Sequence, residues 1–490
     1  MNKSVIIIGA GFAGLSAAAF MAKAGYRVTV VEKNATAGGR AARLQAQGFT
    51  FDMGPSWYWM PDVFDRFFAQ FGKQVSDYYT LTRLDPSYRV YWPDGGTDIP
   101  AGYSELQSLF ESIEPGSSRQ LDRYLKEAAC KYRVGVQHIV YKPGRSVTEF
   151  LDWQVLRNLF RLDVFTSMER HVGKYFRHYK LRQLMEFPVL FLGALPRNTP
   201  ALYSLMNFAD IVGGTWYPQG GMYSVVEAMH RLAVELGVAF RFGEEAREIV
   251  LEQGAARGVA TDKGTYRADA VISGADYYFT EKHLLPPAFR SYPEAWWDKK
   301  VLAPSCLLYY VGIGKKLPRL CHHALFFDVP FDRHAGEIYR QPRWPEEPLF
   351  YVSAASVTDP SAAPEGCENL VLLIPVAAGL EQDTEALREH YFDKVVRRLE
   401  QHTGESIKEH VVYKKTFSVS DFVSGYNSYK GNAYGLANTL GQTAIFRPSC
   451  ESKKVKRLFY TGQFTVPGPG VPPSLISGEV TSGRVLKLLN

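Results

Sequence analysis

Three glycines near the N-terminus have the spacing of a phosphate-binding turn. The segment 9–14 reads GAGFAG; it follows a β-branched run at 5–8 and precedes a helix of small residues at 15–24. In this context Gly9 permits a tight turn, Gly11 lets the backbone approach a pyrophosphate, and Gly14 allows close packing of helix on strand. The N-terminus of the following helix favours an anion, because its N–H groups are free and the helix dipole is positive there.

An acidic residue one strand later completes the pattern. A second strand is predicted over 27–31 and ends at Glu32, followed by Lys33. A carboxylate at the position of Glu32 accepts hydrogen bonds from a ribose diol in dinucleotide-binding units. The alternative is a signal peptide, because residues 4–22 carry no charge and follow Lys3. The glycine spacing and the second strand favour a dinucleotide site.

Composition limits the possible fold classes, cofactors and partners. The chain has 490 residues with 46% apolar and 22% charged residues, which suits two or three globular domains and excludes disorder or a fibrous repeat. The five cysteines are scattered, which argues against a disulfide framework or a zinc site and favours a reducing compartment. We find no nucleic-acid motif and no Ser-His-Asp or Cys-His arrangement. The sequence therefore predicts neither a metal nor a nucleic-acid partner.

Two further segments carry glycines and a cation suited to a nucleotide. The loop 37–41 reads AGGRA, where Gly39 allows close approach and Arg40 offers a planar fork to phosphate. A surface salt bridge is the alternative role of Arg40. Near the C-terminus a strand at 458–461 stops at Gly462, and a Pro/Gly loop leads to a helix that we expect to be capped by Ser474. Residues 458–478 are uncharged and long enough to cross a bilayer, but four prolines exclude an unbroken helix.

These motifs resemble those of the bacterial carotenoid (phytoene) desaturases, within the FAD-dependent amine-oxidase-like superfamily. The C-terminal signature P-G-x-G-x-P is matched by PGPGVPPSLISG at 467–478, and the loop after the second strand by AGGRA. Further matches are YSLM at 203–206, WYPQGGM at 216–222, SVTDP at 356–360, PEGC at 364–367, DF at 421–422 and NSYKG at 427–431. Pro473-Ser474 departs from the Gly-Val-like pair of many members and leaves the substrate subtype open.

The resemblance implies an α/β fold with a discontinuous Rossmann-type FAD-binding domain (1–75, 217–290 and 440–490). A helical membrane and substrate insert (76–216) and a second substrate segment (291–439) complete it as a mixed α+β domain. The middle block supports this with a predicted helix at 224–236, strands at 238–242 and 271–273, and a strand pair within 249–261. The implied FAD contacts are Gly9, Gly11, Phe12, Ala13, Gly14, Glu32, Lys33, Gly39, Arg40, Gly54, Pro55, Ser56, Ala246, Gly462, Gln463, Gly470, Val471 and Pro472.

The implied reaction removes a hydride from an allylic carbon to flavin N5 and a proton from its neighbour. Phytoene to lycopene is the leading hypothesis, with quinone or oxygen as the final electron acceptor and a C30 substrate also open. Trp216, Tyr217 and Tyr429 are candidates to line the substrate pocket. We name no catalytic base, because Asp359 and the pair His322-His323 are better explained by structural hydrogen bonds.

Several alternatives stay open at this level. They are a desaturase of a later carotenoid (such as a 3,4-desaturase), an FAD-dependent polyene isomerase, an amine oxidase, and a flavin-free prenyl-lipid carrier of the GDP-dissociation-inhibitor type. The retained nucleotide motifs argue against the carrier, and the loop 467–478 disfavours the amine oxidase.

Charge and hydropathy suggest a membrane surface as a partner. Residues 131–182 hold eleven Lys and Arg against four Asp and Glu, and 187–196 carry no charge. An apolar patch bordered by cations suits a protein that sits on a leaflet, whereas the alternatives are a solvated helix face and an internal helix. We expect a cytoplasmic protein that associates peripherally with the membrane.

Overall fold

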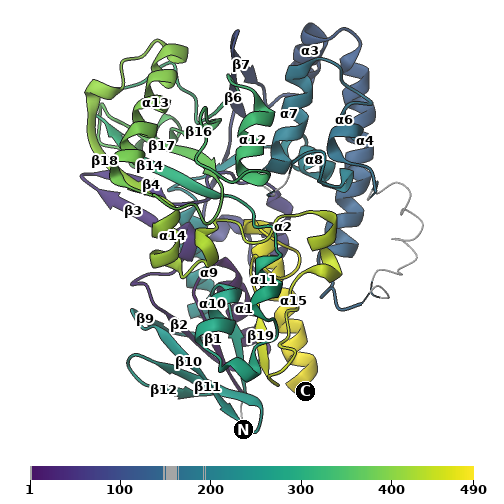
Figure 1. Cartoon of the computed structure of the whole chain (residues 1–490), viewed down its shortest axis with the longest axis vertical. Helices are drawn as coiled ribbons and strands as arrows, with labels where there is room; N and C mark the ends of the chain where they lie inside the picture. The colour runs from purple at the N-terminus through teal and green to yellow at the C-terminus, as the bar shows by residue number, and fades with distance from the viewer. Residues whose placement is uncertain are drawn as a thin grey trace.

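A five-stranded parallel sheet contains both the first and the last strand of the chain. The computed structural model describes residues 3–146, 149, 163, 165–190, 193 and 195–489. Strands from three distant segments pair in the order β19 (Leu458–Tyr460), β13 (Ala270–Ser273), β1 (Ser4–Ile8), β2 (Arg27–Glu32) and β9 (Ala239–Phe242). This is the doubly wound Rossmann-type arrangement, and it confirms the predicted α/β fold. Both termini lie beside this sheet, at the lower end of the molecule in Figure 1.

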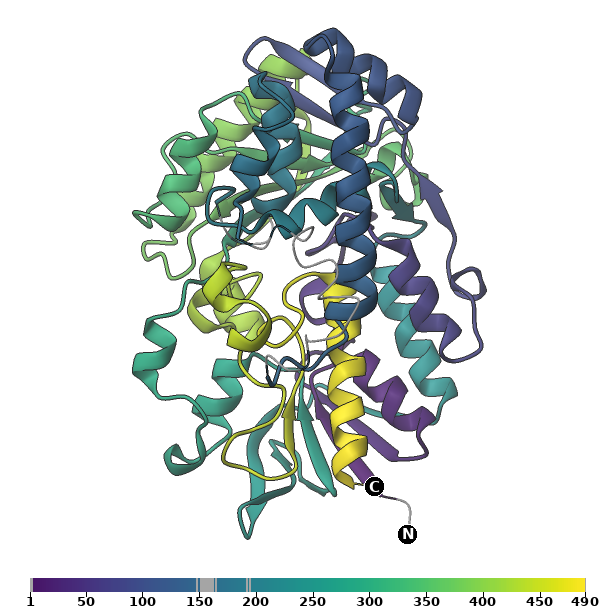
Figure 2. The same ribbon diagram turned by 90° about the vertical axis from the view of Figure 1, so that its right-hand side faces the viewer.

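Helices of small residues allow tight packing beside this sheet. Helix α1 (Phe12–Lys23) contacts both α9 (Tyr223–Glu235) and the long α15 (Val471–Leu489). Gly478 shows how close α15 approaches, because a Cβ there would lie 2.5 Å from the Ser16 side chain. Figure 2 shows α15 in yellow running beside the purple α1. A three-stranded sheet of β10 (Ala246–Glu252), β11 (Ala255–Thr261) and β12 (Thr265–Arg267) lies near the five-stranded sheet.

A seven-stranded sheet forms the other half of the molecule. Its order is β18 (Val411–Phe417), β14 (Ser305–Ile313), β17 (Glu368–Val376), β16 (Phe350–Ser353), β15 (His323–Phe326), β6 (Tyr88–Trp92) and β7 (Gly95–Ile99). We expected a helical insert over 76–216, yet β6 and β7 come from it. Because β15 pairs with β6, the insert and the segment 291–439 share one sheet and one core. The boundaries assigned to the domains stay a prediction.

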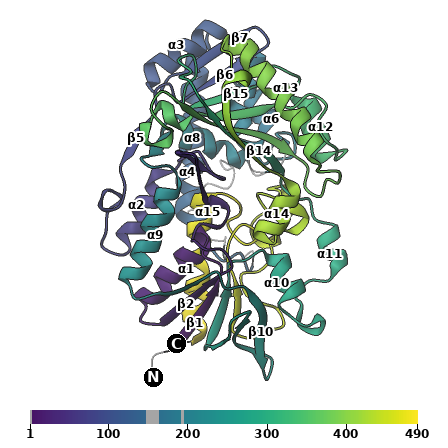
Figure 3. The ribbon, with the colours of Figure 1, turned by 90° about the vertical axis from the view of Figure 1, so that its left-hand side faces the viewer.

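The remaining elements pack around these sheets (Figures 1 and 3). Two short pairs are β3 (Arg43–Ala46) with β4 (Phe49–Asp52) and β5 (Leu81–Arg83) with β8 (Trp216–Pro218). The other helices are α2 (Pro61–Ala69), α3 (Tyr103–Ile113), α4 (Ser117–Val134), α6 (Met168–Val172), α7 (Tyr179–Leu190), α8 (Leu205–Ile211), α10 (Tyr277–His283), α11 (Glu294–Asp298), α12 (Phe331–Tyr339), α13 (Glu385–Thr403) and α14 (Val419–Tyr426). Among the described residues, no helix combines the length and apolar character that crossing a bilayer requires.

The segment 187–196 is internal where it is described. Phe187, Val189 and Leu195 are each at most 2% exposed, so the expected apolar surface patch is wrong for these residues. Phe187 and Val189 are buried because α7 faces the core under the seven-stranded sheet. Residues 191, 192 and 194 lie outside the described part. Among the neighbouring cations, Lys180 forms a 2.6 Å ion pair with Asp94, and Arg182 lies within 4.0 Å of Glu169 and Glu186.

Glu186 on α7 is a buried carboxyl whose charge lowers stability. Burial raises its pKa to about 7, and Arg182 at 3.9 Å opposes this only in part. Because the folded pKa lies above the unfolded value, stability falls as pH rises from about 4.5 to 7. We expect Glu186→Gln to raise the free energy of unfolding by up to about 3 kcal/mol at pH 8 and by less than about 1 kcal/mol at pH 5. Urea titrations at the two pH values measure this; equal gains at both would contradict it.

Candidate functional site

The carboxyl ends of the parallel strands border a cavity of about 260 Å³. Ligands bind at this edge of open α/β sheets. Fifteen of the eighteen predicted FAD contacts line it: Gly9, Gly11, Phe12, Ala13, Glu32, Lys33, Gly39, Arg40, Gly54, Pro55, Ala246, Gly462, Gln463, Gly470 and Val471. The fold thus brings together residues from both ends and the middle of the chain.

Three predicted contacts lie outside this cavity's lining. Gly14 serves the packing that its spacing predicted, since a Cβ there would stand 2.0 Å from the Gly9 carbonyl oxygen. Ser56 follows Pro55, which lines the cavity, but is not itself part of the lining. Pro472 follows the first residue of α15. The expected cap at Ser474 is also wrong, because the helix begins at Val471 and the Ser474 hydroxyl donates to the Gly470 carbonyl at 2.7 Å.

The Glu32 carboxylate fixes the turn that surrounds it. Its two oxygens accept the backbone N–H groups of Ala10 at 2.8 Å and Asn34 at 2.9 Å. An ionised carboxylate has about four acceptor positions, so each oxygen keeps capacity for a ribose hydroxyl. Lys33 donates to the Ser424 carbonyl at 2.9 Å and so connects this edge with α14.

The cavity fits an anionic dinucleotide on three observations. Helix α1 has Gly11 as its N-cap, without a side-chain cap or an acidic residue in its first turn, so its N–H groups are available to an anion. A Cβ on Gly11 would meet only the Gly38 carbonyl oxygen, at 3.9 Å, which leaves open space beside the backbone. Within the described protein the buried Arg40 Nε has no hydrogen-bond partner. These features suit the pyrophosphate of FAD.

The Arg40 guanidinium is anchored by other protein groups, and its Nε remains available as a hydrogen-bond donor. Its Nη2 donates to the Ser428 hydroxyl at 3.0 Å and lies 3.8 Å from the Asp276 carboxylate. Burial lowers the pKa of the guanidinium, and Asp276 opposes this shift. The salt-bridge alternative is therefore correct in part, but the pair is buried at the cavity.

We expect Arg40→Lys to weaken FAD binding by about tenfold or more, because a lysine cannot bond Ser428 and a phosphate through one planar fork. FAD titration of the deflavinated protein, followed by flavin fluorescence, measures the affinity. Arg43→Lys is the matched control, since Arg43 pairs with the exposed Glu227 and lies outside the cavity lining. Equal effects of the two substitutions would contradict this role for Arg40.

The three aromatic residues predicted for the substrate pocket line neither cavity described here. The Trp216 indole donates to the Gly213 carbonyl at 2.8 Å, and the Tyr217 hydroxyl donates to Asp359 at 3.1 Å. Tyr429 packs on Tyr278 with ring centroids 4.0 Å apart. Their side chains take part in packing, and their role as substrate contacts stays a prediction.

Asp359 and the histidine pair have the expected structural roles. Asp359 also accepts the Gly220 N–H at 2.8 Å, and His322 Nδ1 lies 2.8 Å from the Thr358 hydroxyl. His323 Nδ1 lies 2.7 Å from the Tyr351 hydroxyl. Burial lowers the pKa of His322 to about 3, so its imidazole is neutral at pH 7.

The lining residues that the sequence missed include six from the seven-stranded sheet and from 422–434. They are Cys306, Leu308, Leu373, Phe422, Tyr426 and Tyr434. They form an apolar wall of the nucleotide cavity. Tyr426 and Tyr434 lie close to the NSYKG motif, which was the available local signal. The strand residues had none, because uniformly buried strands do not show which side chains face a ligand.

A second cavity of about 60 Å³ adjoins the first. It shares Cys306, Leu373 and Tyr434 with the nucleotide cavity. Apolar and aromatic side chains dominate its lining. A long apolar molecule that reaches into this cavity would therefore pass the nucleotide site.

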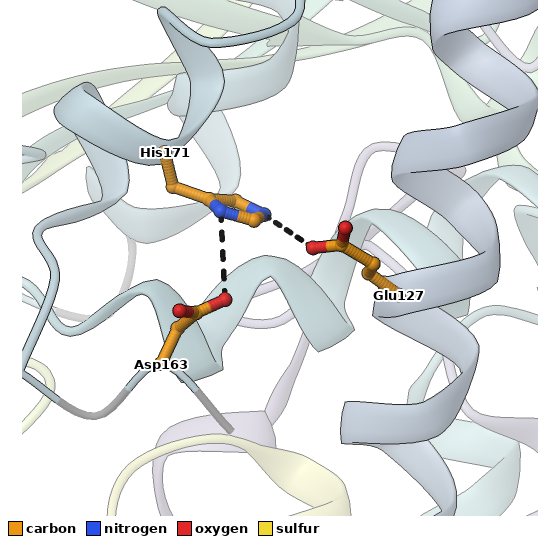
Figure 4. Close-up of side chains that lie close together, drawn as sticks. All are labelled: Glu127, Asp163 and His171. Atoms are coloured by element: carbon orange, nitrogen blue, oxygen red, sulfur yellow. Dashed lines mark ion pairs between the residues drawn. The ribbon is translucent and has the colours of Figure 1, made fainter. Parts of the chain in front are cut away.

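The described residues contain one His and carboxylate cluster of metal-site type, formed by Glu127, Asp163 and His171. The two carboxylates face different ring nitrogens, at 4.0 and 3.7 Å (Figure 4). Lys131 lies inside the cluster, with its amine 2.9 Å from Asp163 and 3.3 Å from His171 Nε2. Burial and this neighbouring charge lower the pKa of His171 to about 4. The cluster is an ion-pair network around the buried Lys131 and His171, in which the lysine supplies the cation.

The comparisons with known proteins agree with this geometry. The flavin containing amine oxidoreductase family matches residues 12–486. The chain belongs to this family. A carotenoid 3,4-desaturase of Haloarcula japonica is 41% identical over 488 residues, which are 99% of this chain and 98% of that protein.

Two further relatives match over the same length. A zeta-carotene-forming phytoene desaturase of Myxococcus xanthus is 34% identical, covering 99% of this chain and 94% of that protein. A 4,4'-diapophytoene desaturase of Staphylococcus aureus is 31% identical, covering 99% and 98%. The chain is thus a member of the carotenoid desaturase group of flavoproteins and an FAD-dependent oxidoreductase, as its motifs predicted.

Solved structures show the same fold at low identity. Putrescine oxidase bound to putrescine aligns with a TM-score of 0.63 and 16% identity over 99% of both chains. A fatty acid isomerase from P. acnes aligns with a TM-score of 0.60 and 13% identity, over 100% of this chain and 99% of that one. These similarities establish the architecture of this family member and nothing about its substrate.

Proposed function

We propose that this enzyme desaturates an acyclic carotenoid, with phytoene to lycopene as the leading conversion. The observation that carries the proposal is the junction of the two cavities at Cys306, Leu373 and Tyr434. A site for a dinucleotide lies there beside a space whose lining is apolar, which suits a hydrocarbon. The activities of the three relatives, all carotenoid or diapocarotenoid desaturases, support the substrate class.

The protein's part in the reaction is to align and desolvate the substrate. Bound FAD would supply the two-electron acceptor for a hydride from an allylic carbon, while the neighbouring carbon loses a proton and the new double bond forms. Buried side chains such as Leu308 and Leu373 exclude water from the developing allylic cation. The aromatic rings of Phe422 and Tyr434, which line the nucleotide cavity, present π faces that stabilise positive charge.

The substrate's solubility favours delivery from a membrane. The cation-rich segment 131–182 includes two exposed aromatic side chains, Phe165 at 90% and Tyr179 at 45% exposure. Exposed aromatics beside cations suit an anionic lipid surface. A quinone dissolved in the same membrane is then the electron acceptor that we propose, with oxygen as the alternative. Co-sedimentation with anionic and neutral vesicles tests the membrane contact.

The pigments of phytoene-accumulating bacteria that express this chain test the substrate assignment. We expect structured absorption bands between about 400 and 520 nm, a range in which longer conjugated polyenes absorb, and the band positions count the added double bonds. A colourless extract from cells that contain the flavin-loaded protein would exclude phytoene.

A desaturase of a later carotenoid is the second candidate, favoured by the 41% identity to a 3,4-desaturase. Lycopene-accumulating cells distinguish it, because 3,4-desaturation lengthens the chromophore and shifts the bands to the red. An isomerase would change the chromatographic retention without adding a double bond.

A further inference from the structure

The second cavity follows one row of side chains across the seven-stranded sheet. Directly opposed residues of antiparallel strands point to the same face. The register opposes Leu308 to Leu373, Leu373 to Tyr351, and Tyr351 to Leu325. The row therefore crosses four strands on one face, roughly 14 Å at about 4.8 Å per strand step.

This row begins at the nucleotide cavity and leads away from it. Leu308 and Leu373 line the nucleotide cavity, whereas Leu373, Tyr351 and Leu325 line the second one. Helix α12 covers the row, and its Ala335 and Ile338 also line the second cavity. A rod-shaped polyene on this row would have one end beyond the flavin, between α12 and the sheet.

Phe187 closes the far end of the row. It lines the second cavity and is 1% exposed. Its ring packs 6.1 Å from Phe327, which follows β15, and 5.5 Å from Tyr88 of β6. These aromatic contacts thus lie where β15 pairs with β6, at the end of the row where the second cavity ends.

We propose that the second cavity binds the terminal segment of the polyene and that Phe187 determines which carbon–carbon bond is oxidised. This rests on the proposed function. The cavity confines the end of the chain, so the point at which this end stops sets the bond that lies beside the flavin. A deeper cavity moves the oxidised bond away from the chain end, and a shallower one moves it towards the end.

Product regiochemistry in variants of the cavity tests this. Full-length, flavin-loaded enzyme is given phytoene in phosphatidylcholine vesicles, and the new double bonds are located by absorption and mass spectrometry. We expect Phe187→Ala and the milder Phe187→Leu to move desaturation away from the chain end, changing the ratio of positional products by about tenfold (about 1.4 kcal/mol between binding registers). Ala335→Leu, which fills the cavity, is expected to shift the ratio the other way.

Two further measurements distinguish a change in the position of the oxidised bond from a loss of protein stability or of turnover rate. Phe110→Leu is the matched control, because Phe110 is fully buried in the same core cluster but lines neither cavity; its product ratio should stay unchanged. Binding of a polyene with cyclohexenyl rings at both ends, followed by tryptophan fluorescence quenching, is expected to tighten at least tenfold in Phe187→Ala.

Failure of the role proposed for Phe187 and failure of the proposed function give different experimental results. Unchanged product positions in folded Phe187→Leu and Ala335→Leu, with only the rate altered, would overturn the role of Phe187. A wild-type enzyme that neither binds nor oxidises any polyene would instead overturn the proposed function.

Discussion

Gly11→Ala is expected to abolish FAD binding at micromolar concentrations, with an affinity loss of about 100-fold, while the apo-protein folds normally. The backbone of Gly11 is extended, with φ −76° and ψ 176°, so alanine is conformationally acceptable. Its new Cβ would meet no protein atom closer than 3.9 Å and would project into the space that we assign to the pyrophosphate. FAD titration measures the affinity, and urea unfolding of the apo-protein should change by at most about 1 kcal/mol.

Gly14→Ala is the matched comparison and should behave differently. Its Cβ would lie 2.0 Å from the Gly9 carbonyl oxygen, so the turn or the helix must shift. We expect the apo-protein itself to lose about 3 kcal/mol or more of unfolding free energy. If Gly11→Ala instead kept its flavin, the cavity would not be the pyrophosphate site.

Lys131→Met is expected to destabilise the protein by about 3 kcal/mol or more. The Lys131 side chain is fully buried, and its amine contacts Asp163 and His171. Removing the amine leaves the Asp163 carboxylate without its nearest cation, and breaking a buried ion pair costs about 3–5 kcal/mol. Urea unfolding at pH 7 measures the loss.

Two variants control this result. Lys126→Met removes an exposed lysine from the same helix and should change stability by no more than about 0.5 kcal/mol. Adding Asp163→Asn to Lys131→Met should recover part of the loss, because the unpaired charge disappears as well. A Lys131→Met protein as stable as the wild type would contradict the ion-pair assignment.

Local sequence motifs supplied most of the predicted FAD contacts. Glycine spacing, the acid after the second strand and the Arg40 loop are short-range patterns whose physical requirements are met within a few residues, so they could be read without a structure. Fifteen predicted contacts accordingly line one cavity. The error at Ser474 concerns where a helix begins, which local pattern does not set.

Hydropathy misled at the segment 187–196. An uncharged run beside cations has the same composition on a membrane surface as in a core, and only packing distinguishes them. Phe187 is buried because α7 meets β6 and β15, which are separated from it by long stretches of sequence. The aromatic candidates Trp216, Tyr217 and Tyr429 stay predictions, because they line neither of the two cavities.

The sequence by itself determined the cofactor class and the family, because a phosphate-binding turn needs particular residues at particular spacings. Only the tertiary structure decided where the polyene would lie. That path depends on strand register, which aligns Leu308, Leu373, Tyr351 and Leu325 from four separate segments on one face. Register is set by long-range pairing, so no local pattern in a uniformly buried strand records it.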